Sequence, residues 1–531
     1  MSKIVSPAEL HARLRGDNEI ALLDVREEGV FAKRHLLRAA PMPLSRLETR
    51  LPTLVPRRGT PVVLCDDGDG LAARAAAKMA RFGYGEVALL DGGVAGWAEA
   101  GYMLFGGVHV PSKAFGEFVE QAYETPRIEA SDLDRRRAAG DDLVILDSRP
   151  MAEYRRMNIP GGIDVPGAEL AYRVHDVAPR PETTVIVNCA GRTRSIIGAQ
   201  SLINAGIANP VMALKDGTMG WHLAGLDLER GQSRRAPAVS PEGLARARAA
   251  AARVARRFGV RTIDRDGLAR LEAEADRRGL YLFDVRDPDE YAAGHLPGSR
   301  SAPGGQLVQA TDTYVGAWNT RLVLVDDSGV RATMTASWLI QMGWREVYVL
   351  AEGLGGATLI GGAAATPVLG LDACEAETIT VETLARMLDA GAAVVVDLDD
   401  SLAYRAGHIP GAWFAVRSRL DAALAKLPAK GDLVFASQDG VIARLAAADM
   451  TATSGRPTLA LDGGTDAWRA AGLALEEGES RMAAATDDVW YKPYDHAAGV
   501  EDQMRAYLSW EVDLVHQIAR DGTLSFARFP D

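Results

Sequence analysis

The sequence predicts an α/β protein of four tandem units, each a parallel sheet flanked by helices, followed by a C-terminal helical tail. Three observations support this prediction. Short apolar strands recur at a regular spacing, alanine-rich helical segments lie between them, and a glycine-rich turn closes each unit. Strands that alternate with helices in this way form βαβ units, whose parallel sheet is covered on both faces.

Each unit opens with an apolar strand that ends in an acidic motif: ALLDVR, VILDSR, YLFDVR and VVVDLD. After a turn, a second buried strand follows: VVLC, VIVN, LVLV and LVFA. A loop and a helix come next, and a third strand ends in a glycine turn: ALLDGGVAGW, ALKDGTMGW, VLAEGLGGA and ALDGGTDAW. The same order of elements therefore occurs four times.

We place the copies at 1–115, 116–235, 258–372 and 373–480. Each has about 110 residues, enough for a core of its own. Because a long linker separates the second copy from the third, we expect copy one to pack with copy two and copy three with copy four. From Ser240 this linker has the pattern of a capped, alanine-rich helix, which we interpret as solvated rather than as a nucleic-acid surface.

The tail, 481–531, lies outside the repeats and begins with the aromatic segment DVWYKPYD. An apolar helical face follows, so we expect this helix to dock on the body; it is formed by Met504, Tyr507, Leu508, Val515 and Ile518.

Composition is that of an ordinary globular protein, with 47% hydrophobic and 24% charged residues among 531. The net charge of −12 argues against nucleic acid and against an anionic membrane surface as partners. The N-terminus has no apolar signal-peptide region and no apolar run has membrane-spanning length, so we expect a cytoplasmic protein. Three widely spaced cysteines suit a reducing compartment and make a disulfide framework or a zinc site improbable.

The most informative stretch is 184–206, TVIVNCAGRTRSIIGAQSLINAG. We expect a buried strand at 184–188, a turn at 189–194 and a helix at 195–205. Cys189 thus follows a strand and precedes a helix N-terminus, where unpaired amides and the helix dipole favour negative charge. Arg192 and Arg194 add full positive charges, so the position favours a thiolate and an anionic ligand.

The repeats provide an internal control for this cysteine. Counting back from the glycine that follows each helix places Asp66, Cys189 and Asp326 at the same position, and in copy four the position falls at or beside Ser437. Only copy two therefore has a nucleophilic thiol, and we expect the other three copies to be catalytically inactive. Cys65 ends a strand and is interpreted as a buried structural residue, while two nearby glutamates make Cys374 a poor nucleophile.

The segment around Cys189 resembles the active-site loop of the rhodanese (sulfurtransferase) family. The resemblance implies that the Cys189 thiolate attacks the outer sulfur of a small anionic donor such as thiosulfate and becomes a persulfide. A thiol, sulfite or cyanide then accepts that sulfur. The reaction needs no cofactor and no metal.

The resemblance also suggests roles for the loop residues. The amides of Ala190, Gly191, Thr193 and Ser195 should stabilise charge on the sulfur. Arg192 and Arg194 should hold the sulfonate of the donor, although one of them can instead point to solvent. These two arginines favour an inorganic donor over mercaptopyruvate.

Outside the loop, the resemblance gives Asp147 and Arg149 a supporting, mainly structural role. The family usually has Gly-His-Ile-Pro-Gly in the turn before the second strand. Copy two instead has Asn158, where copies three and four have His295 and His408, so we expect an altered turn. His175 is interpreted as an ordinary histidine.

The sequence suggests two rival functions. Related phosphatases have five residues between cysteine and arginine, whereas Arg194 is the fifth residue after Cys189, so we expect no useful phosphatase activity. The second rival is a sulfur carrier or scaffold that passes the persulfide to a protein acceptor. In a further hypothesis the tail residues Trp490, Tyr491 and Tyr494 cover the cleft of copy two, the alternative being simple packing on the nearest copy.

Overall fold

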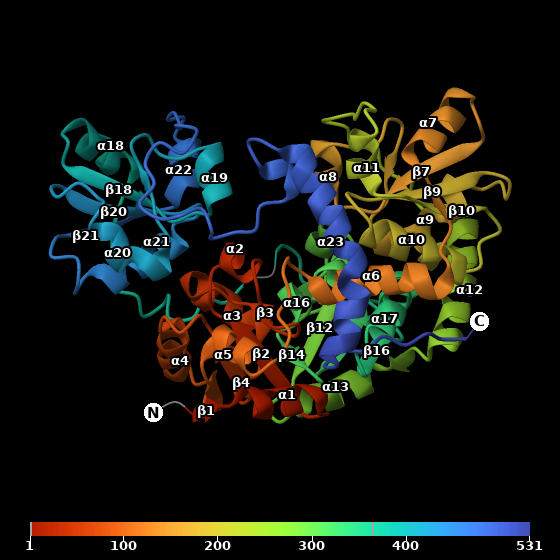
Figure 1. Cartoon of the computed structure of the whole chain (residues 1–531), viewed down its shortest axis with the longest axis horizontal. Helices are drawn as coiled ribbons and strands as arrows, with labels where there is room; N and C mark the ends of the chain where they lie inside the picture. Colours follow the sequence, from red (N-terminus) through yellow and green to blue (C-terminus); the bar gives the residue numbers. More distant parts are fainter. Residues whose placement is uncertain (1–2, 364–365, 531) are drawn as a thin grey trace.

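The structure, a computed structural model, describes residues 3–363 and 366–530. It contains four parallel sheets covered by helices, as the repeats predict (Figure 1). The strand orders are β1-β5-β4-β2 with β3 beside β2, β6-β10-β9-β7-β8, β11-β16-β15-β12-β13 and β17-β21-β20-β18-β19. The four copies therefore share one topology.

Copy one comprises β1 Lys3–Val5, α1 Pro7–Arg15, β2 Ile20–Asp24, α2 Glu28–Phe31, β3 Ala40–Pro41, η1 Leu44–Arg46, α3 Leu47–Leu54, β4 Val62–Cys65, α4 Leu71–Arg81, β5 Val87–Leu90 and α5 Gly93–Glu99. Helix α6, Val110–Tyr123, leads into copy two. Copy two comprises β6 Arg127–Ile128, α7 Ala130–Ala138, β7 Leu143–Asp147, α8 Met151–Arg156, β8 Ile163–Asp164, η2 Gly167–Glu169, α9 Leu170–Val177, β9 Thr184–Asn188, α10 Thr193–Asn204, β10 Val211–Leu214 and α11 Gly217–Leu223.

The linker helix is α12 Pro241–Phe258. Copy three comprises β11 Arg261–Ile263, α13 Arg265–Ala273, β12 Leu280–Asp284, α14 Pro288–Ala293, β13 Arg300–Ser301, α15 Gly304–Gln309, α16 Thr311–Tyr314, β14 Ala317–Trp318, β15 Arg321–Val325, α17 Val330–Gln341 and β16 Glu346–Leu350. Copy four comprises β17 Glu377–Ile379, α18 Val381–Asp389, β18 Ala393–Asp397, α19 Ser401–Ala406, β19 Trp413–Phe414, η3 Arg417–Arg419, α20 Leu420–Leu424, β20 Asp432–Ala436, α21 Val441–Met450, β21 Thr458–Leu461 and α22 Gly464–Ala470. The tail holds η4 Pro493–Asp495 and α23 Val500–Asp521.

The strand before the cysteine, β9, is buried along its whole length. Its β-branched residues pack well in a sheet that is covered on both faces. It lies between β7 and β10, so Val187 is paired with Leu146 on one side and Ala213 on the other. The carboxyl end of this central strand places Cys189 at the edge of the sheet, where ligands of α/β proteins bind. Helix α10 begins at Thr193, two residues before the predicted start.

The arrangement of the copies differs from the expected pairing of one with two and three with four. Strand β14 of copy three pairs antiparallel with β2 of copy one, with Ala317 opposite Ala21. Copy three also contacts copy two, where a Cβ on Gly305 would lie 3.0 Å from the Cα of Gly167. Copy four packs on copy one, because Arg417 forms a 2.7 Å ion pair with Glu48. The pairing was wrong because these contacts join residues that are far apart in the sequence.

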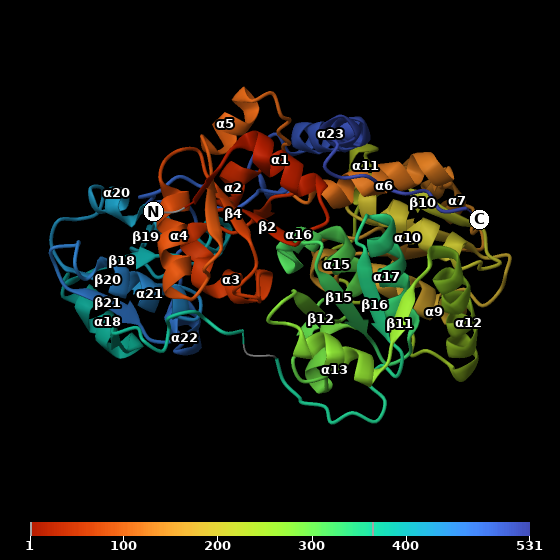
Figure 2. The same ribbon diagram turned by 90° about the horizontal axis from the view of Figure 1, so that it is seen from below.

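The linker helix α12 has the predicted cap, since the Ser240 hydroxyl accepts a 2.9 Å hydrogen bond from the Gly243 amide. It is not merely solvated. Its apolar face, which includes Ala247, Val254 and Phe258, is buried, and the helix packs against α9 of copy two and α17 of copy three (Figure 2). The helix therefore joins the two copies that it connects in sequence.

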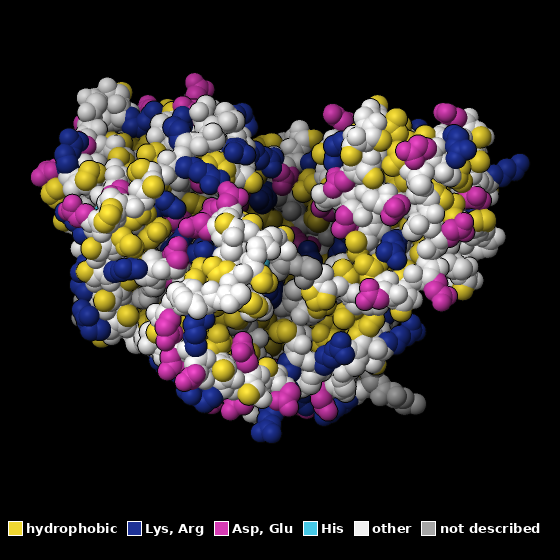
Figure 3. Space-filling view, turned by 180° about the vertical axis from the view of Figure 1, so that it is seen from behind, with side chains coloured by type: hydrophobic (Ala, Val, Ile, Leu, Met, Phe, Trp, Pro, Cys, Tyr) yellow, Lys and Arg dark blue, Asp and Glu magenta, His cyan; other side chains and the backbone are white. Residues whose placement is uncertain are grey.

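The tail crosses from copy four to copy two, and α23 then packs across α6 (Figures 1 and 2). Asp495 links copy two to copy four, because its carboxylate pairs with Arg156 of copy two at 2.7 Å and its carbonyl accepts from Arg405 of copy four. Seen from behind, a notch at the top of the molecule separates copy two from copy four (Figure 3). The predicted tail helix is present, with Met504 and Ile518 buried.

No helix in residues 3–363 and 366–530 combines the length and apolar character needed to cross a membrane.

We expect Arg417→Met to weaken the attachment of copy four to copy one. The side chains of Arg417 and Glu48 are 4% and 3% exposed, so the substitution leaves a buried carboxylate. The free energy of unfolding should fall by about 3 kcal/mol, the low end for a broken buried ion pair because Lys78 also contacts Glu48. Urea unfolding measures the change. Arg13→Met, which breaks an exposed pair with Glu9, is the control and should cost less than about 0.5 kcal/mol; equal losses would contradict this account.

Candidate active site

Cys189 lies directly after β9 and is 2% exposed. Its Sγ donates to Ser195 Oγ at 3.5 Å, and the Ser195 hydroxyl donates to the Arg192 carbonyl at 2.8 Å. The loop after β10 approaches closely, because a Cβ on Gly217 would lie 2.3 Å from the Cys189 carbonyl oxygen. Gly217 also has φ +56°, so a glycine is required there.

The amides of this loop have no acceptor within the described chain. The first amide of α10 that donates to a backbone carbonyl is that of Ile196, which bonds Arg192 at 3.1 Å. Residues 190–195 therefore present free N–H groups at a helix N-terminus, next to the cysteine sulfur. Such a group of donors suits a negatively charged atom.

In the other copies a side chain fills the corresponding place. The Asp66 carboxylate accepts from the amides of Gly68 and Ala72 at 3.0 and 2.9 Å. Asp326 accepts from the amides of Gly329 and Arg331 at 2.7 and 3.0 Å, and Ser437 Oγ accepts from the Ala443 amide at 3.2 Å.

These bonds confirm the positions assigned by counting. They also explain more than charge repulsion does, because a side chain already occupies two amides of the loop in copies one and three and one amide in copy four.

Arg192 faces three carboxylates rather than the cysteine. Its guanidinium contacts Glu117 at 2.7 Å, Glu120 at 2.6 Å and Asp216 at 3.2 Å, and its side chain is 6% exposed. Burial lowers the pKa of Arg192, but the three acids together raise it by more, so its net pKa lies above the ordinary value. Arg192 thus ties the loop to α6.

Arg194 also has a carboxylate partner, Glu153, at 2.8 Å, and it donates to Gln306 of copy three at 3.2 Å. Burial lowers the pKa of Arg194, whereas Glu153 and, less strongly, Cys189 raise it, so its net pKa lies above the ordinary value. Although burial raises the pKa of Glu153, Arg194 and Lys492 lower it to about 2.

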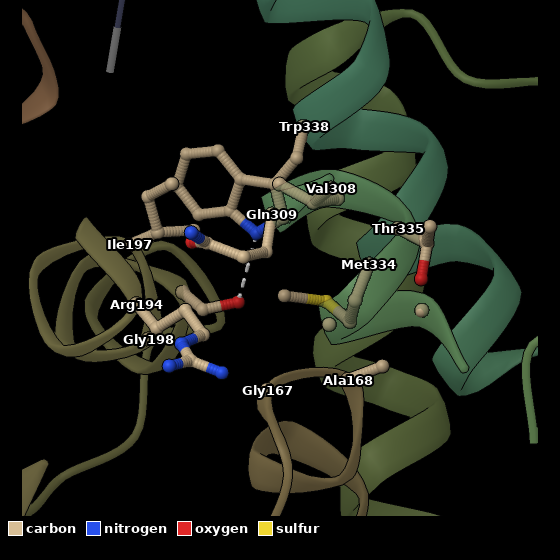
Figure 4. A pocket seen from close by; sticks show the side chains of 13 residues that line it. Gly167, Ala168, Arg194, Ile197, Gly198, Val308, Gln309, Met334, Thr335 and Trp338 are labelled. Atoms are coloured by element: carbon tan, nitrogen blue, oxygen red, sulfur yellow. Dashed lines mark hydrogen bonds between the residues drawn. The ribbon is translucent and has the colours of Figure 1, made fainter. Parts of the chain in front are cut away.

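The cavity that Arg194 borders is narrow. It lies between α10 and copy three, among Ile197, Met334 and Trp338 (Figure 4). Its volume is about 30 Å³, close to that of one water molecule, and it is lined mainly by apolar groups. It is not large enough for a donor and an acceptor together. A wider cavity of about 690 Å³ lies between copies one and four, beside Ser437 and away from the Cys189 loop.

Asp147 and Arg149 support the site from below. Arg149 forms bonds of 2.8 and 2.7 Å to the Asp147 carboxylate and donates to the Met157 carbonyl, and Asn188 donates to Asp147 at 3.0 Å. All of these side chains are buried, so the pair fixes the start of the loop.

The expected alteration of the turn at Asn158 is small. Its side-chain amide donates to the Tyr154 carbonyl at 3.3 Å, as the imidazoles of His295 and His408 contact the corresponding tyrosine carbonyls at 3.0 and 2.7 Å. The structure shows no role for His175 at the loop. Burial and the neighbouring Arg246 lower the pKa of its imidazole.

The remaining cysteines differ from Cys189. Cys65 is fully buried, its thiol lies 3.7 Å from the Leu23 carbonyl, and burial raises its pKa well above the ordinary value. Cys374 is partly exposed and packs at the edge of the core of copy four. In the described residues, no group of three or more histidines, cysteines and acids could hold a metal ion.

Sequence reasoning missed a cluster of three residues beside the loop, in which Lys113 contacts Tyr507 and Glu511. Lys113 lies on α6, and Tyr507 and Glu511 lie on α23. A Cβ on Gly191 would lie 3.3 Å from the Tyr507 ring and 3.5 Å from a Glu511 oxygen. The apolar face of α23 was the available signal, but nothing local showed what it covers.

The three tail aromatics named from the sequence do not act together as a cover. Tyr491 donates to Ser401 of copy four at 3.1 Å. Tyr494 packs with the apolar group around Ala190, and Trp490 lies beside Lys113 at 5.9 Å. The part of the tail that contacts the Cys189 loop directly is α23.

We expect Arg192→Met to destabilise the protein, because it leaves Glu117, 1% exposed, without its counter-charge. The free energy of unfolding should fall by about 3–5 kcal/mol in urea titrations. Arg127→Met is a matched control, since Arg127 also pairs with Glu120 but is 50% exposed, and it should cost less than about 1 kcal/mol. A loss in Arg192→Met no larger than in the control would show that the arginine does not hold the loop.

Comparison with known proteins agrees with this geometry. The family model described as Rhodanese-like domain matches residues 6–100, 129–224, 267–357 and 380–471. A solved structure described as thiosulfate sulfurtransferase from Pseudomonas aeruginosa is 50% identical, covers 99% of this chain and 100% of its own, and superposes with a TM-score of 0.95.

Two curated relatives match shorter stretches. The thiosulfate sulfurtransferase GlpE of Pseudoalteromonas translucida is 28% identical over 78 residues, which are 15% of this chain and 72% of the relative. The HTH-type transcriptional regulator Rv0324 of Mycobacterium tuberculosis is 34% identical over 104 residues, which are 20% of this chain and 45% of the relative. The chain thus spans less than half of that regulator. Since the family model matches all four repeats, which make up well over half of the sequence, the chain belongs to the rhodanese-like domain family.

Proposed function

We propose that the protein is a sulfurtransferase that moves a sulfane sulfur from thiosulfate, or a similar anionic donor, to a thiophilic acceptor through a persulfide on Cys189. The observation that carries the proposal is the contrast among the four loops. Only the described loop of copy two joins a cysteine to amides that no side chain occupies. The similarity to a thiosulfate sulfurtransferase over nearly the whole chain supports the choice of donor.

In the first step the Cys189 thiolate attacks the outer sulfur of thiosulfate. The bond between the two sulfurs of the donor breaks, and its electron pair leaves with sulfite. The product is Cys189–S–S⁻, and the total charge is unchanged. A thiolate or cyanide then attacks the outer sulfur of the persulfide, and the electron pair of the S–S bond returns to Cys189.

The chain assists through charge stabilisation and position. The free amides at 190–195 lie where they can donate to the persulfide, as oxyanion-hole donors do. The Ser195 hydroxyl, 3.5 Å from Sγ, can turn from the Arg192 carbonyl and donate to the sulfur once the thiol has lost its proton. We assign Arg194 to the charge of the donor and Arg192 to holding the loop, because three carboxylates already surround Arg192.

A relay to a protein acceptor is the second candidate. Cys189 is 2% exposed and lies under α23, so a protein could reach its sulfur only after this helix moved. The rate at which cyanide and small thiols discharge the persulfide separates the two functions. Rapid discharge favours free turnover, and a persulfide that persists until a partner is added favours the relay.

We expect intact-mass spectrometry after thiosulfate treatment to show one added sulfur in the wild type and none in Cys189→Ala. The double variant Cys65→Ser, Cys374→Ser is the matched control and should still gain one sulfur, because neither residue lies at the free amides. Addition of cyanide should remove the sulfur. An unmodified wild type, or a sulfur retained in Cys189→Ala, would contradict the proposal.

We expect Arg194→Met to raise the KM for thiosulfate by about tenfold or more, the effect of losing one interaction with a charged group, with little change in the KM for cyanide. Steady-state kinetics with each substrate varied in turn measure both constants. Arg155→Met, also on the copy-two surface but outside the loop, is a control and should leave both unchanged. An unchanged KM for thiosulfate in Arg194→Met would exclude this role.

A further inference from the structure

Three hydrogen-bond donors from three separate elements converge on one carboxylate oxygen beside the Cys189 loop. Glu511 Oε1, on α23, accepts from the Tyr507 hydroxyl at 2.8 Å, from the Lys113 ammonium at 3.2 Å and from the Thr193 hydroxyl at 3.4 Å. Lys113 lies on α6 and Thr193 begins α10. Donors arranged in this way form an anion-binding site, and a side chain of the tail occupies it.

The second oxygen of this carboxylate is poorly satisfied. Glu511 is 1% exposed, yet its Oε2 has no hydrogen-bond partner in the described chain. It faces the loop, since a Cβ on Gly191 would lie 3.5 Å from it. Leaving a buried acceptor without a donor is unfavourable, and more so for a charged group. A carboxylate therefore does not use the site fully.

The ammonium of the site is held away from water. The Lys113 side chain is 3% exposed and its Nζ lies 4.5 Å from the ring centre of Tyr507 and 5.6 Å from that of Trp510. Aromatic faces stabilise a cation in such a position. Burial lowers the pKa of Lys113, while Glu511 and the Cys189 thiolate oppose that shift. The charge of the site thus depends on an anion beside it.

The cations around the loop are otherwise neutralised within the body of the protein. Arg192 is paired with acids of α6 and of the β10 turn, and Arg194 is paired with Glu153 of α8. Glu511 differs because it belongs to the terminal helix, outside the four repeats. An incoming anion could therefore take the place of the Glu511 carboxylate without breaking an ion pair within copy two.

From this geometry we infer that Lys113, Tyr507 and Thr193 form a binding site for a sulfonate or sulfite anion next to Cys189, and that Glu511 fills it until such an anion enters. The inference rests on the proposed function, because it assigns the site to the donor and to the leaving sulfite. Exchange of the carboxylate for a sulfur oxyanion keeps negative charge beside the Lys113 ammonium. The additional oxygens of a sulfonate can accept from the free loop amides, which a carboxylate does not reach.

Anion binding can be tested without sulfur chemistry in Cys189→Ala. Sulfite is titrated into this variant, and binding is followed by calorimetry and by the fluorescence of Trp490 and Trp510, which lie 5.9 and 5.6 Å from Lys113 Nζ. Adding Glu511→Gln removes the charge of the occupant and should tighten sulfite binding about tenfold or more, whereas adding Lys113→Met should weaken it by at least as much. Lys113→Arg should retain most of the affinity.

Glu501→Gln is the control on the same helix, because Glu501 is 56% exposed and pairs with Arg505. It should leave the affinity unchanged. The fold of each variant is checked by far-UV circular dichroism, and Lys113→Arg keeps the test valid should Lys113→Met unfold. The inference is wrong if sulfite fails to bind Cys189→Ala, or binds it with an affinity that neither Glu511→Gln nor the Lys113 variants alter.

The two proposals can fail separately. Sulfite binding that depends on Lys113, together with no persulfide in the wild type, would refute sulfur transfer but keep the anion site. A persulfide on Cys189 with sulfite affinity independent of Lys113 would do the reverse. In the wild-type background, Glu511→Gln should lower the KM for thiosulfate and leave that for cyanide unchanged.

Discussion

Free backbone amides at the start of α10 are the feature on which the chemistry of this protein depends. A helix N-terminus leaves N–H groups without intrahelical acceptors, and a folded chain normally satisfies them with a side chain. Asp66, Asp326 and Ser437 do so in three copies. In copy two a cysteine takes that position, and its amides stay open. At this position the copies therefore differ in whether a side chain accepts from the amides.

The other three copies help to position this site. Copy three extends the sheet of copy one through β14 and contributes Gln306 to the environment of Arg194. Copy four contacts the start of the tail through Arg405. The tail then reaches copy two, where Asp495 pairs with Arg156, and α23 packs on α6. The active loop is therefore closed by elements from outside its own repeat, and this arrangement gives the additional copies a physical role.

The sequence was sufficient for the repeat and for the place of Cys189 after a buried strand, because both depend on local signals. A buried β-branched strand such as 184–188 is recognised from a short stretch of chain. The same is true of the count that aligns Asp66, Cys189 and Asp326. The Ser240 cap was equally local. Contacts between distant residues could not be read in this way. Arg192 meets Glu117, 75 positions away, and Thr193 meets Glu511, 318 positions away.

The arrangement of the copies escaped prediction for the same reason, since β14 is a two-residue strand whose partner lies in another repeat. The length of the linker did not predict which copies pack together. Helix α12 packs against α9 and α17 through an alanine-rich face, and alanines give little sign in the sequence that a face is buried.

A crystal structure of the protein after treatment with thiosulfate tests the central claim most directly. The account predicts one additional sulfur atom bonded to Cys189 Sγ and directed at the amides of 190–195, with Cys65 and Cys374 unchanged. An unmodified Cys189 in crystals of the treated protein, or a sulfur bonded to either of the other cysteines, would contradict it.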